Sequence, residues 1–227
     1  MMRQRVAIVA AMEREVAPLI RGWKVRTVEY GGRRYKFFEN GNAVLICGGI
    51  GADSARRATE AVIGEASPDR VLSVGFAGAL NSAMKIADVL EPRTVINAAD
   101  GSRTDTGSGE GMLLSYAEIA NRDQKQRLGK SYAAATVDME AAAVAQGAQA
   151  RRVAFAALKA ISDVADFAMP PMDRFVSADG RFRSVWFALH VAVRPWLWGS
   201  TIALGRNSAR ASRALCSAIE KYLEREY

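Results

Sequence analysis

Acidic side chains follow apolar segments at three points in this sequence of 227 residues. Glu15 comes shortly after the first apolar run, and Asp138 and Glu140 flank a methionine at the start of an alanine-rich run. Asp163 and Asp166 close the most apolar stretch in the middle of the chain. A carboxyl group in such a position can accept or donate a proton, which accelerates suitable reactions by about 10²–10⁴-fold. The pattern therefore indicates a pocket that carries acid–base chemistry.

Each of these features also has a structural interpretation. Glu13 and Glu15 could complement the dipole of a helix whose first turn they occupy, and Asp138 could cap a helix. Gly75 and Gly78, in the run SVGFAGAL, could be turn glycines that no ligand approaches. What the features share is a place at the end of a predicted strand. Ligands of open α/β sheets gather at the carboxyl ends of strands, which favours a binding site.

Short apolar runs alternate along the chain with alanine-rich amphipathic stretches, which predicts strands alternating with helices. The predicted fold is a single α/β domain over 1–227, with a central mixed, mostly parallel β-sheet flanked by helices. The polar stretch 100–111 is the expected mobile loop. Strands are predicted at 5–11, 24–30, 33–40, 42–49, 70–80, 87–98, 111–115 and 153–161, and helices at 12–20, 51–63, 117–128, 139–150 and 206–226.

Composition excludes several classes of protein. The chain has two cysteines, Cys47 and Cys216, and one histidine, His190, so neither a disulfide framework nor a zinc site is expected. No metal or cofactor is predicted. The reducing cytoplasm is the expected location, and the first twelve residues have an apolar core too short for a secretion signal. The net charge of +7 comes from dispersed basic residues, which favours a solvated surface over a nucleic-acid site.

Five motifs occur in order along the chain: AAMEREV, GGIGADSA, SVGFAGAL, VDMEAAAVA and KAISDVAD. Their order and spacing resemble the purine nucleoside phosphorylase and uridine phosphorylase family, over about residues 6–166. The resemblance is closest to its methylthioadenosine/S-adenosylhomocysteine nucleosidases, and VDMEAAAVA followed by AISDVAD is its most specific part. It implies a nucleoside phosphorylase-like fold, a small-molecule nucleoside as substrate, and a homodimer.

The resemblance assigns roles to individual residues. Asp163 matches the acid that protonates or hydrogen-bonds N7 of the adenine, and Ser162 matches the serine that helps to place this carboxyl group. Glu15 matches the carboxylate that activates water. Met139 and Glu140 match the pair at the ribose, where Glu140 accepts hydrogen bonds from the hydroxyls.

Two further positions are expected at the base. Ile119 and Ala120 fall where the family stacks an aromatic residue on the adenine and reads it through the backbone. Gly78 is expected to line the same pocket. Breaking an N-glycosidic bond leaves negative charge on the base and positive charge on the ribose, so an acid at one and a carboxylate at the other stabilise the transition state. Burial beside an apolar strand is expected to keep Asp163 protonated.

Two predicted substrate-binding residues depart from the nucleosidase pattern. Phe76 stands where the nucleosidases carry a serine that helps to hold the water. Lys159 stands where they carry an arginine, and lysine keeps the charge but loses the forked geometry. The phosphorylases usually place an arginine at the position of Ser73 and a phosphate-binding serine at that of Phe76. Because both phosphate ligands are missing, hydrolysis fits better than phosphorolysis.

Residues 167–205 form an atypical aromatic-rich segment, with four aromatic side chains around Arg194-Pro195. His190 and Arg194-Pro195 interrupt it well short of the roughly 20 apolar residues that a membrane span needs. Three interpretations are open. The favoured one is a pair of helices packed on the core or on a dimer partner. The others are an apolar substrate channel and a peripheral membrane or lipid contact through Trp186–Trp198. The runs DGRF, RPWLW and LGRNSARASRAL, within residues 179–215, are also similar to the tail of hopanoid-associated phosphorylases, which would act on an adenosyl group joined to a large lipid.

The sequence thus predicts a purine nucleosidase that hydrolyses the N-glycosidic bond of a 5′-substituted adenosine and releases adenine. The stretch 98–111 is shorter than in typical methylthioadenosine nucleosidases, which suggests a more open 5′ end of the pocket. One alternative is a nucleoside phosphorylase that acts on adenosyl lipids. A second alternative, motivated by Phe76 and Lys159, is a nucleoside-binding protein with little catalysis.

Overall fold

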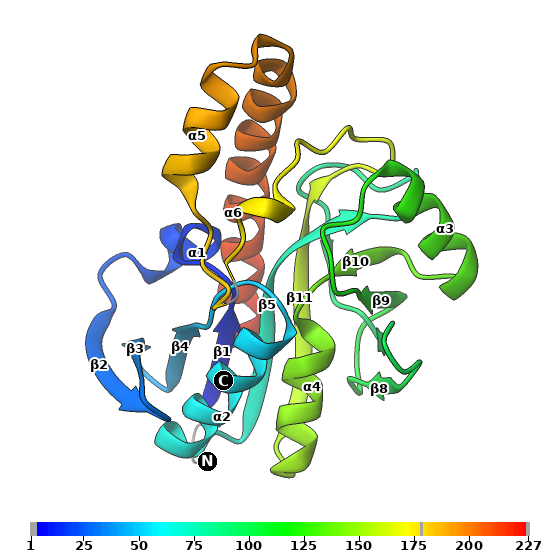
Figure 1. Cartoon of the computed structure of the whole chain (residues 1–227). Helices are drawn as coiled ribbons and strands as arrows, with labels where there is room; N and C mark the ends of the chain where they lie inside the picture. The colour runs from blue at the N-terminus through cyan, green and yellow to red at the C-terminus, as the bar shows by residue number, and fades with distance from the viewer. Residues whose placement is uncertain (1–3, 178, 226–227) are drawn as a thin grey trace.

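One mixed β-sheet runs through the centre of the molecule (Figure 1). The computed structural model describes residues 4–177 and 179–225, and the eleven strands found within them share this sheet. Its main path has the order β2-β3-β4-β1-β5-β10-β9-β7-β8, while β11 lies between β5 and β6. The strands are β1 (Val6–Ala10), β2 (Lys24–Tyr30), β3 (Arg33–Asn40), β4 (Ala43–Cys47), β5 (Arg70–Ala79), β6 (Val89–Leu90), β7 (Thr94–Asn97), β8 (Arg103–Asp105), β9 (Met112–Ser115), β10 (Thr136–Asp138) and β11 (Ala154–Asp163).

Helices cover both faces of the sheet, which confirms the predicted α/β class. On one face α2 (Ala52–Ala66) packs against α4 (Ala141–Ala150), and on the other α1 (Glu13–Ile20) packs against α6 (Trp198–Arg225). The shorter helix α3 (Arg122–Tyr132) covers a small cluster beside β7 and β9. The long terminal helix begins eight residues before its predicted start, and its predicted last residue, 226, lies outside the described residues.

The central strands are buried on both sides. Every residue of β1 is buried, because β1 pairs in parallel with β4 and β5 and lies under helices on each face. Successive side chains of a strand point to opposite faces. Accordingly Ile8 belongs to the core beneath α1 and α6, whereas Ala7 and Val9 belong to the core beneath α2 and α4. Double burial explains why this strand reads as a continuous apolar run.

The sequence allowed Gly75 and Gly78 to be turn glycines, but the glycine-rich stretch that contains them is not a turn. Gly75 and Gly78 lie inside β5, which continues to Ala79. The strand can continue because it has partners along its whole length: β1 and β11 flank its first part in parallel, and β10 pairs with its end in antiparallel fashion. The two glycines therefore leave room for side chains that pack against this strand, as described with the site below.

Three other predicted elements differ in detail. The stretch 100–111 contains a strand, β8, which pairs with β7, so its prediction as a loop is wrong for residues 103–105. The predicted strand 87–98 is split into β6 and β7 around Pro92, which has no N–H to give to a ladder. The predicted helix 117–128 begins only at Arg122, because the side chain of Asn121 caps it by accepting the N–H of Gln124 at 3.0 Å. Residues 117–121 are left as an irregular segment.

The aromatic segment folds as a helical hairpin that projects from the rest of the molecule (Figure 1). Helix α5 (Ser184–Ala192) packs against the first part of α6, and the short 3-10 helices Asp173–Phe175 and Pro195–Leu197 flank it. Trp186 and Trp196 are 65% and 75% exposed, so packing of these side chains in the core of their own chain is ruled out. None of the described helices is long and apolar enough to cross a membrane.

Candidate active site

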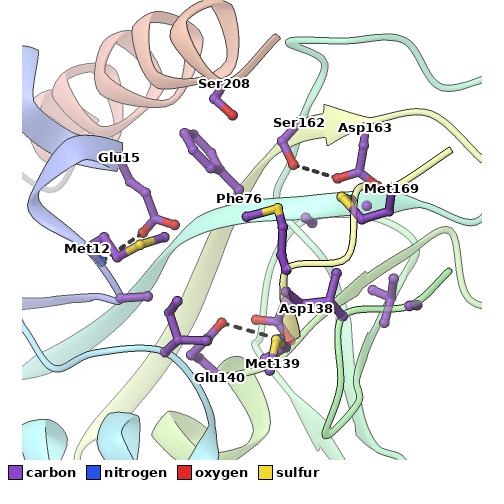
Figure 2. Close-up of a pocket in the computed structure, with 18 of the residues that line it drawn as sticks. Met12, Glu15, Phe76, Asp138, Met139, Glu140, Ser162, Asp163, Met169 and Ser208 are labelled. Atoms are coloured by element: carbon purple, nitrogen blue, oxygen red, sulfur yellow. Dashed lines mark hydrogen bonds between the residues drawn. The ribbon is translucent and has the colours of Figure 1, made fainter. Parts of the chain in front are cut away.

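A cavity of about 150 Å³ lies where β1, β5, β10 and β11 end (Figure 2). Its walls also include the irregular segment 117–121 and part of α6. Nine of the ten residues predicted for the site line this one cavity, although they come from separate parts of the chain. These nine are Glu15, Phe76, Gly78, Ile119, Ala120, Met139, Glu140, Ser162 and Asp163.

Asp163 is the last residue of β11 and is 4% exposed. Its neighbour Ser162 donates a hydrogen bond to the Oδ1 atom of Asp163 at 2.7 Å. Both side chains line the cavity, which a regular strand does not allow because its successive side chains point to opposite faces. The pairing of β11 with β5 is shifted by one residue at Ser162. This bulge turns two consecutive side chains toward the same space.

A buried lysine contacts the carboxyl group of Asp163. The ammonium of Lys125, from the first turn of α3, forms a salt bridge with the Oδ2 atom and donates a hydrogen bond to the carbonyl of Val164 at 2.8 Å. The Lys125 side chain is 1% exposed. The carboxyl group is therefore paired with a cation, whereas the sequence suggested an apolar setting.

Gly78 makes room for this pair. A Cβ atom at Gly78 would lie 2.8 Å from the Oδ2 atom of Asp163 and 3.1 Å from the Cε atom of Lys125. Any larger residue at position 78 would push the carboxyl group or the lysine away. Gly75 has a similar place beside Glu15, whose Oε2 atom would be 3.3 Å from a Cβ atom at position 75.

Glu15 occupies the first turn of α1 and is 3% exposed. The backbone N–H of Met12 donates to its Oε2 atom at 3.2 Å. Burial raises the pKa of Glu15, although the charge of Lys159 and the hydrogen bond from Met12 oppose this change. A carboxylate with a raised pKa is a stronger base, so Glu15 is suited to accepting a proton.

Glu140 enters the cavity from the start of α4. Two backbone N–H groups hold its carboxyl group: that of Gly51 donates at 2.8 Å and that of Met139 at 3.3 Å. Burial raises the pKa of Glu140 to about 7, and the nearby charge of Asp138 adds to the effect. Figure 2 shows the carboxyl groups of Glu15, Glu140 and Asp163 around the same cavity.

Lys159 is the predicted site residue that does not line the cavity. Its ammonium lies 2.9 Å from the Oδ2 atom of Asp138, and both side chains are almost fully buried. Burial opposes the charged form of Lys159, but Asp138, Glu140 and Glu15 together outweigh it and raise the pKa of the lysine. The lysine thus neutralises several carboxyl groups without lining the cavity, and its predicted contact with substrate stays a prediction.

Asp138 has the structural role that the sequence left open. Its carboxylate accepts the backbone N–H of Ala141 at 2.9 Å, in the first turn of α4, and the hydroxyl of Ser115 at 2.5 Å. The cap and the ion pair with Lys159 use the same carboxylate. Asp138 therefore fixes the start of the helix from which Glu140 enters the cavity.

Sequence reasoning missed several residues of the cavity wall. Lys125 lies in a polar helix, where a lysine carries no signal of burial. The other missed residues come mainly from the aromatic segment and α6. The sequence left an apolar substrate channel open for this segment but assigned none of its residues to the site. The missed lining residues include Arg14, Lys125, Met169, Met172, Phe182, Leu204 and Ser208.

The chain also matches a known protein family. The family model described as the phosphorylase superfamily matches residues 5–123 and 108–183 of this chain. The chain belongs to the phosphorylase superfamily. This confirms the resemblance drawn from the five motifs. The resemblance of residues 179–215 to the tail of hopanoid-associated phosphorylases stays a prediction.

Within the phosphorylase superfamily, the chain is similar to named nucleosidases. It is 28% identical to the 5′-methylthioadenosine/S-adenosylhomocysteine nucleosidase of Staphylococcus carnosus, over 71% of this chain and 87% of the relative. The S-adenosylhomocysteine nucleosidase of Streptococcus pyogenes, solved with 5-methylthiotubericidin, superposes with a TM-score of 0.74 at 17% identity and covers 99% of this chain and 98% of its own. The futalosine hydrolase of Helicobacter pylori superposes with a TM-score of 0.68 at 20% identity, over 97% of this chain and 99% of its own. The two structures share the fold.

Proposed function

We propose that this protein hydrolyses the N-glycosidic bond of a 5′-substituted adenosine, of the methylthioadenosine or S-adenosylhomocysteine kind, and releases adenine. The observation that carries the proposal is the convergence of three carboxyl groups on one cavity: those of Glu15 and Asp163 are buried, and that of Glu140 is half-buried. The names of the curated relatives support this class of substrate.

In the proposed reaction, the bond between C1′ of the ribose and N9 of the adenine breaks, and its electron pair leaves with the base. Asp163 delivers a proton to N7, so the purine departs neutral. Water attacks C1′, and Glu15 accepts the proton that this water loses. Met139 and Glu140 bind the ribose, and the Glu140 carboxylate stabilises the positive charge that develops on the sugar.

Phe76 supports hydrolysis over phosphorolysis. Its phenyl ring lines the cavity, and Ser73, three residues earlier on β5, is 1% exposed. An attacking phosphate requires cations or N–H donors, and neither of these side chains supplies one. The arginine that does line the cavity, Arg14, has its guanidinium 5.4 Å from the centre of the Phe182 ring.

The test is an adenine-release assay on a panel of 5′-substituted adenosines, with and without phosphate. We expect equal turnover in phosphate-free buffer and in buffer with millimolar phosphate, with ribose bearing a free 1-hydroxyl as the second product. Strict dependence on phosphate, with a ribose 1-phosphate as product, would make the protein a phosphorylase. Tight binding of adenosine by calorimetry with no adenine released would make it a nucleoside-binding protein.

We further propose that the chain forms a homodimer in the cytoplasm and that the tip of the α5–α6 hairpin contacts anionic lipid. The dimer rests on the family resemblance alone. The lipid contact is supported by exposed side chains, among them Trp186, Val193 and Trp196, on a stretch, 181–219, that contains six arginines and no Asp or Glu. Aromatic groups beside positive charge are typical of interfacial contact with anionic membranes.

Sedimentation tests both of these proposals. Without lipid, we expect the protein to sediment with the mass of a dimer. We expect it to pellet with vesicles that contain anionic lipid but not with neutral vesicles. The variant Trp186→Ala/Trp196→Ala should lose pelleting while keeping adenine release. A monomer at micromolar concentration would contradict the dimer, and equal pelleting of the variant would contradict the lipid contact.

A further inference from the structure

The most unusual side chain outside the predicted site is Lys125. Lysine is almost never fully buried unless it is paired, and Lys125 is 1% exposed although it lies on a polar helix. Among the described residues its ammonium has two partners, the carboxylate of Asp163 and the carbonyl of Val164. It also lines the cavity. The lysine therefore reaches from α3 to the residue that the proposed reaction uses as its acid.

The surroundings hold this pair in place. Asn121 and Gln124 exchange two hydrogen bonds, at 3.0 and 2.8 Å, which fix the first turn of α3 directly before Lys125. On the neighbouring strand β5, Gly78 leaves the space that Lys125 and Asp163 fill. Other charged side chains that line the cavity are Arg14, Glu15, Glu118, Asp138 and Glu140.

The ion pair raises a question about the proposed mechanism. A departing purine needs a proton at N7, and the Asp163 carboxyl group assigned to this step is ion-paired with Lys125. The pair still contains one transferable proton, and that proton lies on Lys125. As negative charge develops on the departing base, N7 becomes more basic and draws a proton along the chain of contacts from Lys125 through Asp163.

We propose that Lys125 is a positioning residue that supplies the transferred proton through Asp163. This inference rests on the proposed function. As the C1′–N9 bond breaks, an N–H bond of Lys125 breaks and its proton passes to the Asp163 carboxylate, which gives a proton to N7. Lys125 ends as a neutral amine, Asp163 ends as a carboxylate, and adenine leaves neutral. The amine regains a proton from solvent after the products leave, and Glu15 returns to solvent the proton that it took from water.

The test compares pH–rate profiles of adenine release for the wild type, Lys125→Met and the matched control Lys130→Met, an exposed lysine on the same helix. For Lys125→Met we expect turnover to fall by about 10- to 100-fold at neutral pH. We also expect the alkaline limb of its profile to move to lower pH by more than about one unit, since the proton must then reside on the carboxyl group alone. Lys130→Met should match the wild type. A uniform loss at every pH, with the alkaline limb unmoved, would show a merely structural role.

A second substrate separates proton supply from folding. A 4-nitrophenyl riboside with the same 5′ group has a leaving group that needs no proton. We expect Lys125→Met to turn it over within about threefold of the wild type, because only the acid step is removed. Lys125→Gln, which keeps a donor for the carbonyl of Val164, should behave in the same way. Loss of activity on both substrates in both variants would overturn the proposal.

The outcomes also separate this inference from the proposed function. A wild-type protein that releases no adenine from any 5′-substituted adenosine would contradict the proposed function itself. An active wild type with unchanged turnover and pH profile in Lys125→Met would contradict the role of Lys125 alone.

Discussion

Replacing Asp163 by asparagine lowers the turnover of adenine release by at least ~100-fold, the low end of what a general acid contributes. Asparagine keeps the shape of the side chain and can accept the hydrogen bond from Ser162, but it cannot hand a proton to N7. The measurement is initial adenine release under saturating substrate. Asp166→Asn is the matched control, because it makes the same change three residues away on an exposed side chain that does not line the cavity.

Folding must be monitored in this variant. Asp163→Asn leaves the ammonium of Lys125 buried without its carboxylate, and breaking one side of a buried pair costs about 3–5 kcal/mol in typical cases. The double variant Asp163→Asn/Lys125→Met removes both charges and should regain most of that stability while staying inactive. Turnover close to the wild type in a folded Asp163→Asn protein would remove Asp163 from the mechanism.

Replacing Glu15 by glutamine has the second largest expected effect, a loss of turnover of about 100-fold or more because no group remains to take the proton from water. Binding of a 5′-substituted adenosine should change by less than about threefold, since Glu15 is assigned to the water and not to the nucleoside. The measurement is KM and kcat for adenine release, with Glu13→Gln as control. Glu13 is an exposed neighbour in the same helical turn, whose contact with Lys36 is a surface ion pair of small energetic value.

The stability of Glu15→Gln is expected to move in the opposite direction from its activity. Because burial raises the pKa of Glu15 in the folded protein, the folded state loses stability as pH rises from about 4.5 through that higher value. Glutamine resembles the protonated form and does not ionise, so the variant should melt at the same or a higher temperature than the wild type at neutral pH. A variant that keeps its turnover, or loses it only by unfolding, would contradict the role of Glu15 as the base.

The hairpin of α5 and α6 links the cavity to the surface of the molecule. Phe182, Leu204 and Ser208 come from this region and line the cavity, while Trp186 and Trp196 lie exposed on the same region. Because the same element lines the cavity and exposes these aromatic groups, we expect the proposed lipid contact to change the rate of adenine release. Adenine release measured with and without anionic vesicles therefore belongs beside the sedimentation test.

The sequence alone was enough to predict the fold class and most of the site. Apolar runs and amphipathic stretches report local periodicity, and in an α/β sheet this periodicity determines which residues are strands and which ends they reach. The acids at those ends, Glu15, Glu140 and Asp163, could therefore be placed together before any coordinates were known. The interpretation of Asp138 as a helix cap could likewise be made from its position before an alanine-rich run.

Only the tertiary structure decided how the charges are paired. Lys125 lies in a polar helix and Lys159 in a core strand, yet both are buried: Lys125 contacts Asp163 and lines the cavity, whereas Lys159 contacts Asp138 and does not. The first pair joins residues 38 positions apart on a polar helix and a core strand, and no local pattern records such a contact. The bulge at Ser162 was hidden for the same reason. Periodicity describes one segment at a time, whereas the charge balance of a buried site depends on which segments meet.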